Sequence, residues 1–195
     1  MNMRIFFTIL ILTLSFQSWT KADDIRDFEI EGISVGDSLL DYYTEIEIIN
    51  SEKTIYPGSK NFYTLHFSVD SKNYDQISIG VKNDDKNYIV YSIAGDKLYR
   101  QNPKNCLPKM KSISEQFDND LKSSRKNQYK HTYDTLAKGK SFAEVVDYSF
   151  PNNSAIRVWC TFFTEEVIKK YDVANGLSVS LGTNKWINFL NNDAY

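Results

Sequence analysis

The sequence predicts an α+β fold, in which a mainly antiparallel sheet carries a long amphipathic helix at about 106–122 and several short helices. The sheet is predicted by segments in which apolar and polar residues alternate, at 63–69, 77–81, 89–93, 142–150 and 155–163. The helix is predicted by five residues at helical spacing: Cys106, Met110, Ile113, Phe117 and Leu121. Antiparallel strands of this kind have one apolar face and one more polar face.

In chain order, the first predicted elements are short. A weakly patterned strand at 25–31 precedes two short helices, the second of which begins at Thr44 as its cap. The strands at 63–69, 77–81 and 89–93 follow. The acidic turn at 83–87 lacks the Asp-x-Asp-x-Asp-Gly spacing of a calcium loop, so we expect a solvated hairpin tip.

The second half begins with the helix at about 106–122, which tolerates Pro108 in its first turn. Residues 123–141 are polar and are expected to form a connection. The remaining elements are a hairpin with a three-residue loop at 152–154, a short helix from Thr164 to Tyr171, a strand at 177–181 and a terminal helix from Thr183.

The composition describes an ordinary globular protein. The 195 residues are 42% hydrophobic and 25% charged, with 8 Gly, 4 Pro and 2 Cys, which excludes collagen-like chains and disulfide-dense miniproteins. There are 23 basic and 25 acidic residues, so no bulk attraction to a polyanion exists, and we expect no nucleic-acid partner.

The N-terminus has the pattern of a cleavable signal peptide. Arg4 precedes an apolar run from Ile5 to Phe16, and the small residues of Thr20-Lys21-Ala22 follow. A membrane anchor is the alternative, but the run is shorter than the roughly 20 residues that span a bilayer. We therefore expect a signal peptide at 1–22, cleavage after Ala22, and a periplasmic or secreted protein with no transmembrane segment.

The mature chain, 23–195, is predicted to be a single α+β domain, because no linker rich in Pro, Gly or Ser divides it. A duplicated unit is an alternative, since each half places helical segments before strands. Export exposes Cys106 and Cys160 to an oxidising compartment. Both face the predicted interface of helix and sheet, so we expect a disulfide that contributes roughly 3–4 kcal/mol. The alternative is a Cys–His nucleophile that uses His131 or His66.

Two stretches resemble small secreted proteins of marine alphaproteobacteria that are uncharacterised. Residues 28–42 read Phe-Glu-Ile-Glu-Gly-Ile-Ser-Val-Gly-Asp-Ser-Leu-Leu-Asp-Tyr, and residues 88–95 read Tyr-Ile-Val-Tyr-Ser-Ile-Ala-Gly, with Cys106 downstream. The resemblance implies a periplasmic or secreted protein and carries over no catalytic residue. The chain is also similar to outer-membrane assembly lipoproteins of the SmpA/OmlA type at the level of fold, although it is longer and has no lipobox cysteine.

Few residues point to catalysis. The sequence contains no Gly-x-Ser-x-Gly, His-Glu-x-x-His, phosphate-loop or Cys-x-x-Cys motif, and we expect no metal and no cofactor. His66 is expected on the polar side of its strand, and His131 beside Asp134 in the polar connection. We expect both histidines to be solvated rather than catalytic.

The candidate binding residues are Trp159, Arg157 and Asp147, on the face of the 142–163 hairpin opposite Cys160. In the predicted register Asp147 and Trp159 are cross-strand neighbours and Arg157 is diagonal to Asp147. An aromatic plane beside an ion pair suits sugars, peptides or another protein. In the alternative interpretation a short helix covers this face, and Trp159 belongs to the core.

Two classes of function remain open. The first is a non-enzymatic envelope module, secreted or periplasmic, that binds a protein, peptide or glycan. The alternative is a small periplasmic hydrolase with an unrecognised active site. An exposed aromatic patch would favour the first class, whereas a concave pocket that holds an acid and a base within reach of each other would favour the second.

Overall fold

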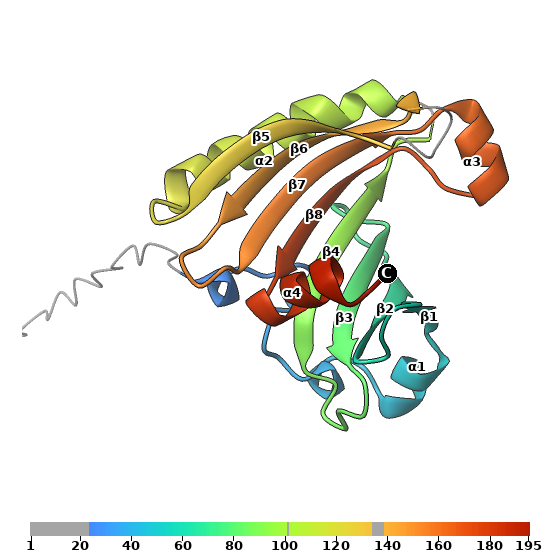
Figure 1. Ribbon diagram of the computed structural model, residues 1–195, viewed down its shortest axis with the longest axis vertical. Helices are drawn as coiled ribbons and strands as arrows, with labels where there is room; N and C mark the ends of the chain where they lie inside the picture. Colours follow the sequence, from blue (N-terminus) through green and yellow to red (C-terminus); the bar gives the residue numbers. More distant parts are fainter. Residues whose placement is uncertain (1–23, 101, 134–138) are drawn as a thin grey trace, which may run out of the picture.

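The computed structural model describes residues 24–100, 102–133 and 139–195. The predicted signal peptide and its cleavage point lie outside these residues. Eight antiparallel strands form one sheet in the order β1-β2-β3-β4-β8-β7-β6-β5 (Figure 1). The strands are β1 (Glu52–Ile55), β2 (Phe62–Ser68), β3 (Gln76–Lys82), β4 (Val90–Leu98), β5 (Arg125–Thr132), β6 (Phe142–Ser149), β7 (Ala155–Phe162) and β8 (Gly176–Gly182).

Short helices complete the mixed α+β class that the sequence predicts. The α-helices are α1 (Glu45–Asn50), α2 (Cys106–Asp120), α3 (Glu165–Tyr171) and α4 (Asn184–Asn192). The threonines predicted to begin helices do so, since each side chain accepts a hydrogen bond from a backbone N–H of the first turn: Thr44, Thr164 and Thr183. In the described part of the chain, no helix is long and apolar enough to cross a membrane.

The two halves of the chain repeat one order of elements. In the first half α1 precedes the meander β1–β4, and in the second half α2 precedes β5–β8, with α3 between the last two strands. The final strands of the two meanders, β4 and β8, pair in antiparallel fashion from Ser92 opposite Gly182 to Leu98 opposite Gly176. This pairing makes one sheet out of two.

The two faces of the sheet differ sharply. The core face carries the apolar residues of every central strand, among them Ile79, Ile93, Ile156, Val158 and Leu181, and it is covered by α2 and the N-terminal segment. The opposite face, here called the polar face, carries Ser78, Ser92, Arg157, Trp159 and Ser180. Figure 1 shows the sheet curving around α4, which lies on this polar face.

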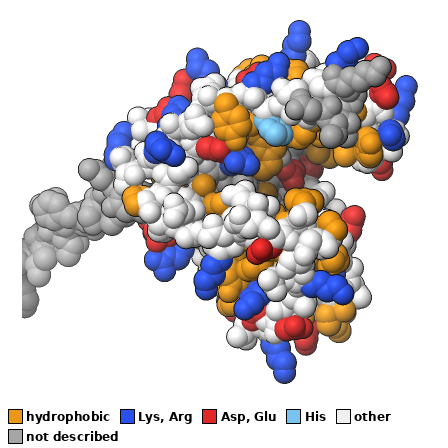
Figure 2. Space-filling view, in the orientation of Figure 1, with side chains coloured by type: hydrophobic (Ala, Val, Ile, Leu, Met, Phe, Trp, Pro, Cys, Tyr) orange, Lys and Arg blue, Asp and Glu red, His pale blue; other side chains and the backbone are white. Residues whose placement is uncertain are grey.

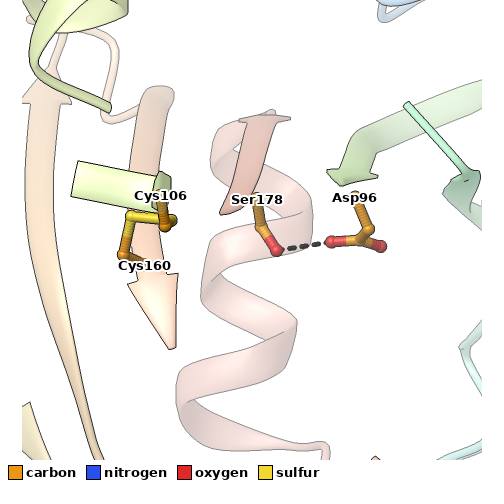
Figure 3. Close-up of a disulfide and its surroundings, with 4 residues drawn as sticks. All are labelled: Asp96, Cys106, Cys160 and Ser178. Carbon is orange, nitrogen blue, oxygen red and sulfur yellow. Dashed lines mark hydrogen bonds between the residues drawn. A yellow bond between two sulfur atoms is a disulfide. The ribbon is translucent and has the colours of Figure 1, made fainter. Parts of the chain in front are cut away.

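The predicted disulfide is present. Cys106, the first residue of α2, is bonded to Cys160 of β7, with their Cα atoms 5.9 Å apart (Figure 3). Both residues are fully buried on the core face. Because the bond uses both thiols, it excludes the alternative of a Cys–His nucleophile.

The helix at 106–122 is shorter and less amphipathic than expected. α2 ends at Asp120, and it buries only Cys106, Met110 and Ser114. Leu121, which the spacing placed on the helix, leaves the helical conformation at φ −96° and ψ 68° and packs into the core. The helical spacing of apolar residues therefore extends one residue beyond the helix itself, because Leu121 is the C-cap residue and its side chain is buried in the core.

The polar connection predicted at 123–141 is wrong in its first part, because Arg125–Thr132 forms the edge strand β5. This strand pairs with β6 along its whole length, from Arg125 opposite Ser149 to Thr132 opposite Phe142. Tyr129 is the half-buried residue of β5, and the other residues of the strand are exposed. An edge strand with both faces in solvent has no apolar alternation, so the period of two is missing from its sequence.

Removal of the disulfide provides the first prediction. The double variant Cys106→Ala, Cys160→Ala should lose about 4 kcal/mol of unfolding free energy, the loop-entropy value for a closed loop of this length. Urea denaturation measures this loss, and the reduced wild-type protein is the control that should match the variant. An equal midpoint for the variant and the oxidised wild type would contradict the prediction.

Candidate functional site

The candidate site is a groove on the polar face, and strand register determines which side chains meet there. Trp159 of β7 lies opposite Ser178 of β8, and Ser178 lies opposite Asp96 of β4. In the next row, Arg157 lies opposite Ser180. Because neighbouring strands are about 4.8 Å apart, the side chains of one row lie next to one another.

The groove has a volume of about 810 Å³ and lies between the polar face and α4. The β6–β7 hairpin forms one wall, to which it contributes Asp147, Arg157 and Trp159. Figure 2 shows the molecule hollowed where the upper strands of Figure 1 overhang its lower part. The three predicted binding residues therefore line one cavity.

The opposite wall is α4, which a small separate core holds on the polar face. Trp186 and Phe189 of α4 pack edge-on and tilted against Tyr56 and Phe62. Gly80 of β3 lies directly beneath Trp186, and a Cβ atom there would come within 2.6 Å of the indole ring. Glycine is therefore required for this close approach, which fixes the width of the groove.

Asp147 and Arg157 form a bidentate ion pair in the groove wall. The guanidinium donates from Nε to Oδ1 at 2.6 Å and from Nη2 to Oδ2 at 3.1 Å, and the Tyr129 hydroxyl donates to Oδ2 at 3.0 Å. Burial works against the charge of Arg157, but the hydrogen bonds and charge of Asp147 outweigh it and hold the pKa of Arg157 above its ordinary value. The two charges neutralise each other.

The register of the hairpin differs by two residues from the predicted one. Arg157 lies directly opposite Asp147, and Trp159 lies opposite Val145 rather than Asp147. The cause is the turn, in which Asn153 adopts a left-handed conformation with φ 61°. The Asn152 side chain accepts hydrogen bonds from Ser154, so the loop closes one residue earlier than expected. The division of residues between the two faces is as predicted.

Trp159 is neither core nor fully exposed. Its side chain is half-buried and lines the groove, opposite Val145 and Ser178. Within the described residues its indole N–H makes no hydrogen bond, and Ser114 Oγ is the buried polar side-chain atom that lacks a partner there. The indole N–H is therefore accessible from the groove. No helix covers Trp159 completely, so the alternative of a buried core tryptophan does not hold.

Sequence reasoning missed a polar network on the same face. His66 Nδ1 lies 2.9 Å from Ser78 Oγ and 3.1 Å from Gln76 Nε2, and His66 Nε2 lies 2.9 Å from Thr54 Oγ1. His66 was expected to be solvated, but it is half-buried and fully engaged. His66, Ser78 and Asp96 each lie at a polar position in the alternating pattern of their strand. Together with the strand order, these positions would have indicated the network.

Asp96 occupies the centre of this face, two strands from Trp159. Ser178 donates a hydrogen bond to its carboxylate, as the close-up in Figure 3 shows. Burial raises the pKa of Asp96 above its ordinary value of 3.8, and the nearby Ser178 and His66 offset only part of this rise. Asp96 and Ser178 also line a second cavity of about 330 Å³, whose rim includes Arg100 and Asp172.

His131 does not take part in either cavity. It is exposed near the end of β5, and its ring packs edge-on against Tyr133 at 4.9 Å. Asp134, its expected neighbour, lies outside the described residues. Among the described residues there is also no cluster of three or more side chains suited to hold a metal ion.

The pKa of Asp96 predicts a pH effect. The folded protein binds the proton of the Asp96 carboxyl more tightly than the unfolded chain does. Asp96 therefore favours folding most below about pH 4, and this contribution to stability is lost as the pH rises through the raised pKa of the folded state. Asp96→Asn should therefore raise Tm at pH 7, because the amide carries no charge to bury.

The gain from Asp96→Asn should shrink toward pH 3, because the wild-type carboxyl is then protonated. Thermal melts of the two proteins at several pH values measure the difference. The exposed Asp70→Asn is the matched control and should show no such trend. A gain for Asp96→Asn that is equal at pH 3 and pH 7 would contradict the assignment.

No family model, no curated protein and no solved structure matches this chain. The resemblance of residues 28–42 to secreted proteins of marine alphaproteobacteria therefore stays a prediction. The chemistry of the groove has to be derived from its own side chains, namely an accessible indole, a neutralised ion pair and a floor of hydroxyl groups.

Proposed function

We propose that this protein is a non-enzymatic binding module of the cell envelope, exported through its N-terminal signal peptide. The observation that carries the proposal is the half-buried Trp159 beside the Asp147–Arg157 pair in a groove of about 810 Å³. The groove has the size of a ligand site rather than of a flat contact patch. The disulfide between Cys106 and Cys160 supports an oxidising compartment, the periplasm or the exterior.

Trp159 is suited to bind because its backbone is already held in place. The backbone of β7 is paired on both sides, so the direction in which the Trp159 side chain leaves the sheet is set before a ligand arrives. A large aromatic side chain with two rotatable χ angles loses little conformational entropy on binding, which is why tryptophans concentrate binding energy. Protein, peptide and glycan ligands all use such an anchor.

A hydrolase is the second candidate, favoured by the contact of Ser78 with His66. An amide nitrogen only donates, so Gln76 Nε2 identifies His66 Nδ1 as an acceptor, and the proton on Nε2 is donated to Thr54. Ser78 Oγ lies 2.9 Å from the same Nδ1 and lines the groove, and a hydroxyl beside an imidazole is the pairing of a nucleophile with its base.

The surroundings of Ser78 favour binding over catalysis. Ser78 lies in the middle of β3, which pairs with β2 and β4 on its two sides. Backbone N–H groups in such a strand are used by the ladder, so none is available there to stabilise an oxyanion. The network is therefore better suited to order the groove floor than to cleave a bond.

Trp159→Ala tests the proposed binding site. The tagged mature variant should capture at least tenfold less ligand from envelope extract than wild type, because the anchor is removed. Its Tm should fall by less than about 8 °C, since a half-buried side chain contributes less than a core one. Trp186→Ala is the matched control, and its Tm should fall further because Trp186 belongs to the small core beneath α4. Undiminished capture by Trp159→Ala would contradict the proposal.

Ser78→Ala tests the hydrolase. If the groove were catalytic, wild type would hydrolyse members of a panel of chromogenic esters, peptides and glycosides, and Ser78→Ala would lose that activity. We expect no Ser78-dependent hydrolysis. The control is Ser112→Ala, which changes an exposed serine on α2, away from the groove.

A further inference from the structure

We infer that the ligand of the groove is an uncharged oligosaccharide, with one sugar ring stacked on Trp159. The inference rests on the proposed binding function and specifies the chemical class of its ligand. Three properties of the groove carry it: the state of its charges, the kind of polar groups on its floor and wall, and the position of that floor within the sheet.

The two opposite charges beside Trp159 are paired with each other. Arg157 and Asp147 are bonded to each other twice, and Tyr129 occupies a further site on the same carboxylate. An anionic ligand would meet the Asp147 carboxylate beside Arg157, and a cationic ligand would meet the Arg157 guanidinium beside Asp147, so the pair offers neither charge alone. Arg125 is the other charged residue of the lining, and it lies at the end of the edge strand β5. An uncharged ligand leaves this bidentate pair in place.

Neutral hydroxyls and amides make up most of the remaining polar lining: Ser92, Ser149, Ser180, Asn188 and Asn191. Among the described residues, the hydroxyls of the three serines make no hydrogen bond, and none is a buried unsatisfied atom, so they face the groove. A hydroxyl both donates and accepts. Every hydroxyl of a sugar also donates and accepts. A groove hydroxyl and a sugar hydroxyl can therefore bond in either direction.

Trp159 supplies the apolar part of the recognition. A pyranose ring has one face of C–H groups, which packs against an aromatic plane, while its hydroxyls point outward toward polar neighbours. Here the neighbours in the adjacent strands are Ser178 and Ser180 on one side and the Asp147–Arg157 pair on the other. The free indole N–H adds a donor at the edge of the ring.

The floor of the groove is unsuited to an extended polypeptide. A peptide strand binds a sheet by extending an open edge, where backbone N–H and C=O groups are free. The groove lies over β3, β4, β8 and β7, each of which has a neighbour on both sides. A polypeptide laid there could not extend the backbone ladder, so its regularly spaced N–H and C=O groups would depend on scattered side chains for partners, and each group left unpaired would cost free energy. A sugar chain has no such backbone.

The experiment uses envelope extract from cells and the tagged mature protein. One portion of the extract is oxidised with periodate, which cleaves vicinal diols of sugars, and another is digested with proteinase K. We expect Trp159-dependent capture to disappear after periodate and to survive proteinase. Capture should change less than twofold between 50 and 500 mM NaCl, because no ion pair forms with the ligand.

Defined probes and variants sharpen the result. Xylo-, cello-, malto- and chitohexaose immobilised on beads are compared with oligogalacturonate and with a mixture of synthetic decapeptides. Trp159→Phe should retain binding within about fivefold, because an aromatic plane remains, whereas Trp159→Ala should lose at least tenfold. Ser180→Ala should weaken capture, and the off-groove control Ser112→Ala should not.

The outcomes separate the two proposals. Trp159-dependent capture that is destroyed by proteinase, that survives periodate while none of the neutral sugar probes is bound, or that is confined to the charged probe overturns the oligosaccharide inference and leaves the binding groove intact. Capture that is equal in wild type and Trp159→Ala, or absent from every untreated extract, overturns the binding groove itself. Periodate-sensitive, proteinase-resistant and salt-insensitive capture supports both.

Discussion

The antiparallel pairing of β4 with β8 joins two four-stranded meanders into one sheet. Because side chains alternate along a strand, this pairing also aligns the faces of the two halves. A register shift by one residue would place Ile93 and Leu181 among serines and would bring Asp96 into the core. The continuous core and the continuous polar face are therefore two consequences of one set of backbone hydrogen bonds.

The polar face remains open because stabilising contacts are concentrated on the other side. The disulfide joins α2 to β7 on the core face, and Tyr148 of β6 donates a hydrogen bond to the carbonyl of Ser114 in α2. Among the described residues, the buried apolar cluster on the polar face is the small core that includes Trp186, Phe189, Tyr56 and Phe62. This small core positions α4 at a distance from Trp159, and the space between them is the groove.

Much of this arrangement follows from local patterns in the sequence. The period of two in 77–81 and 155–163 predicted the strands and their faces, and the opposite phases of Cys160 and Trp159 correctly separated the disulfide from the groove. Threonine caps predicted α3 and α4. These features depend on residues close together in the chain, so the sequence displays them.

The features that the sequence did not reveal depend on distant residues or on single turn conformations. Asp96 and Ser178 are 82 positions apart, and only the β4–β8 pairing makes them partners. The left-handed conformation of Asn153 shifts the register of the β6–β7 hairpin by two residues from the predicted one. A shift of two leaves the alternation of apolar and polar residues unchanged, so the sequence pattern does not reveal it. The strand β5 lacks an apolar face, so its only cue is its pairing with β6.

An open sheet of eight strands has two free edges, and the composition of β5 determines how that edge behaves toward other molecules. Its residues Arg125, Lys126 and Lys130 are exposed, and the opposite edge strand, β1, is only four residues long. Two copies that met along β5 would bring like charges together, and β1 is too short to template a long ladder. The charged residues of β5 and the shortness of β1 thus oppose edge-to-edge pairing of the open sheet, which would otherwise be a template for a second chain.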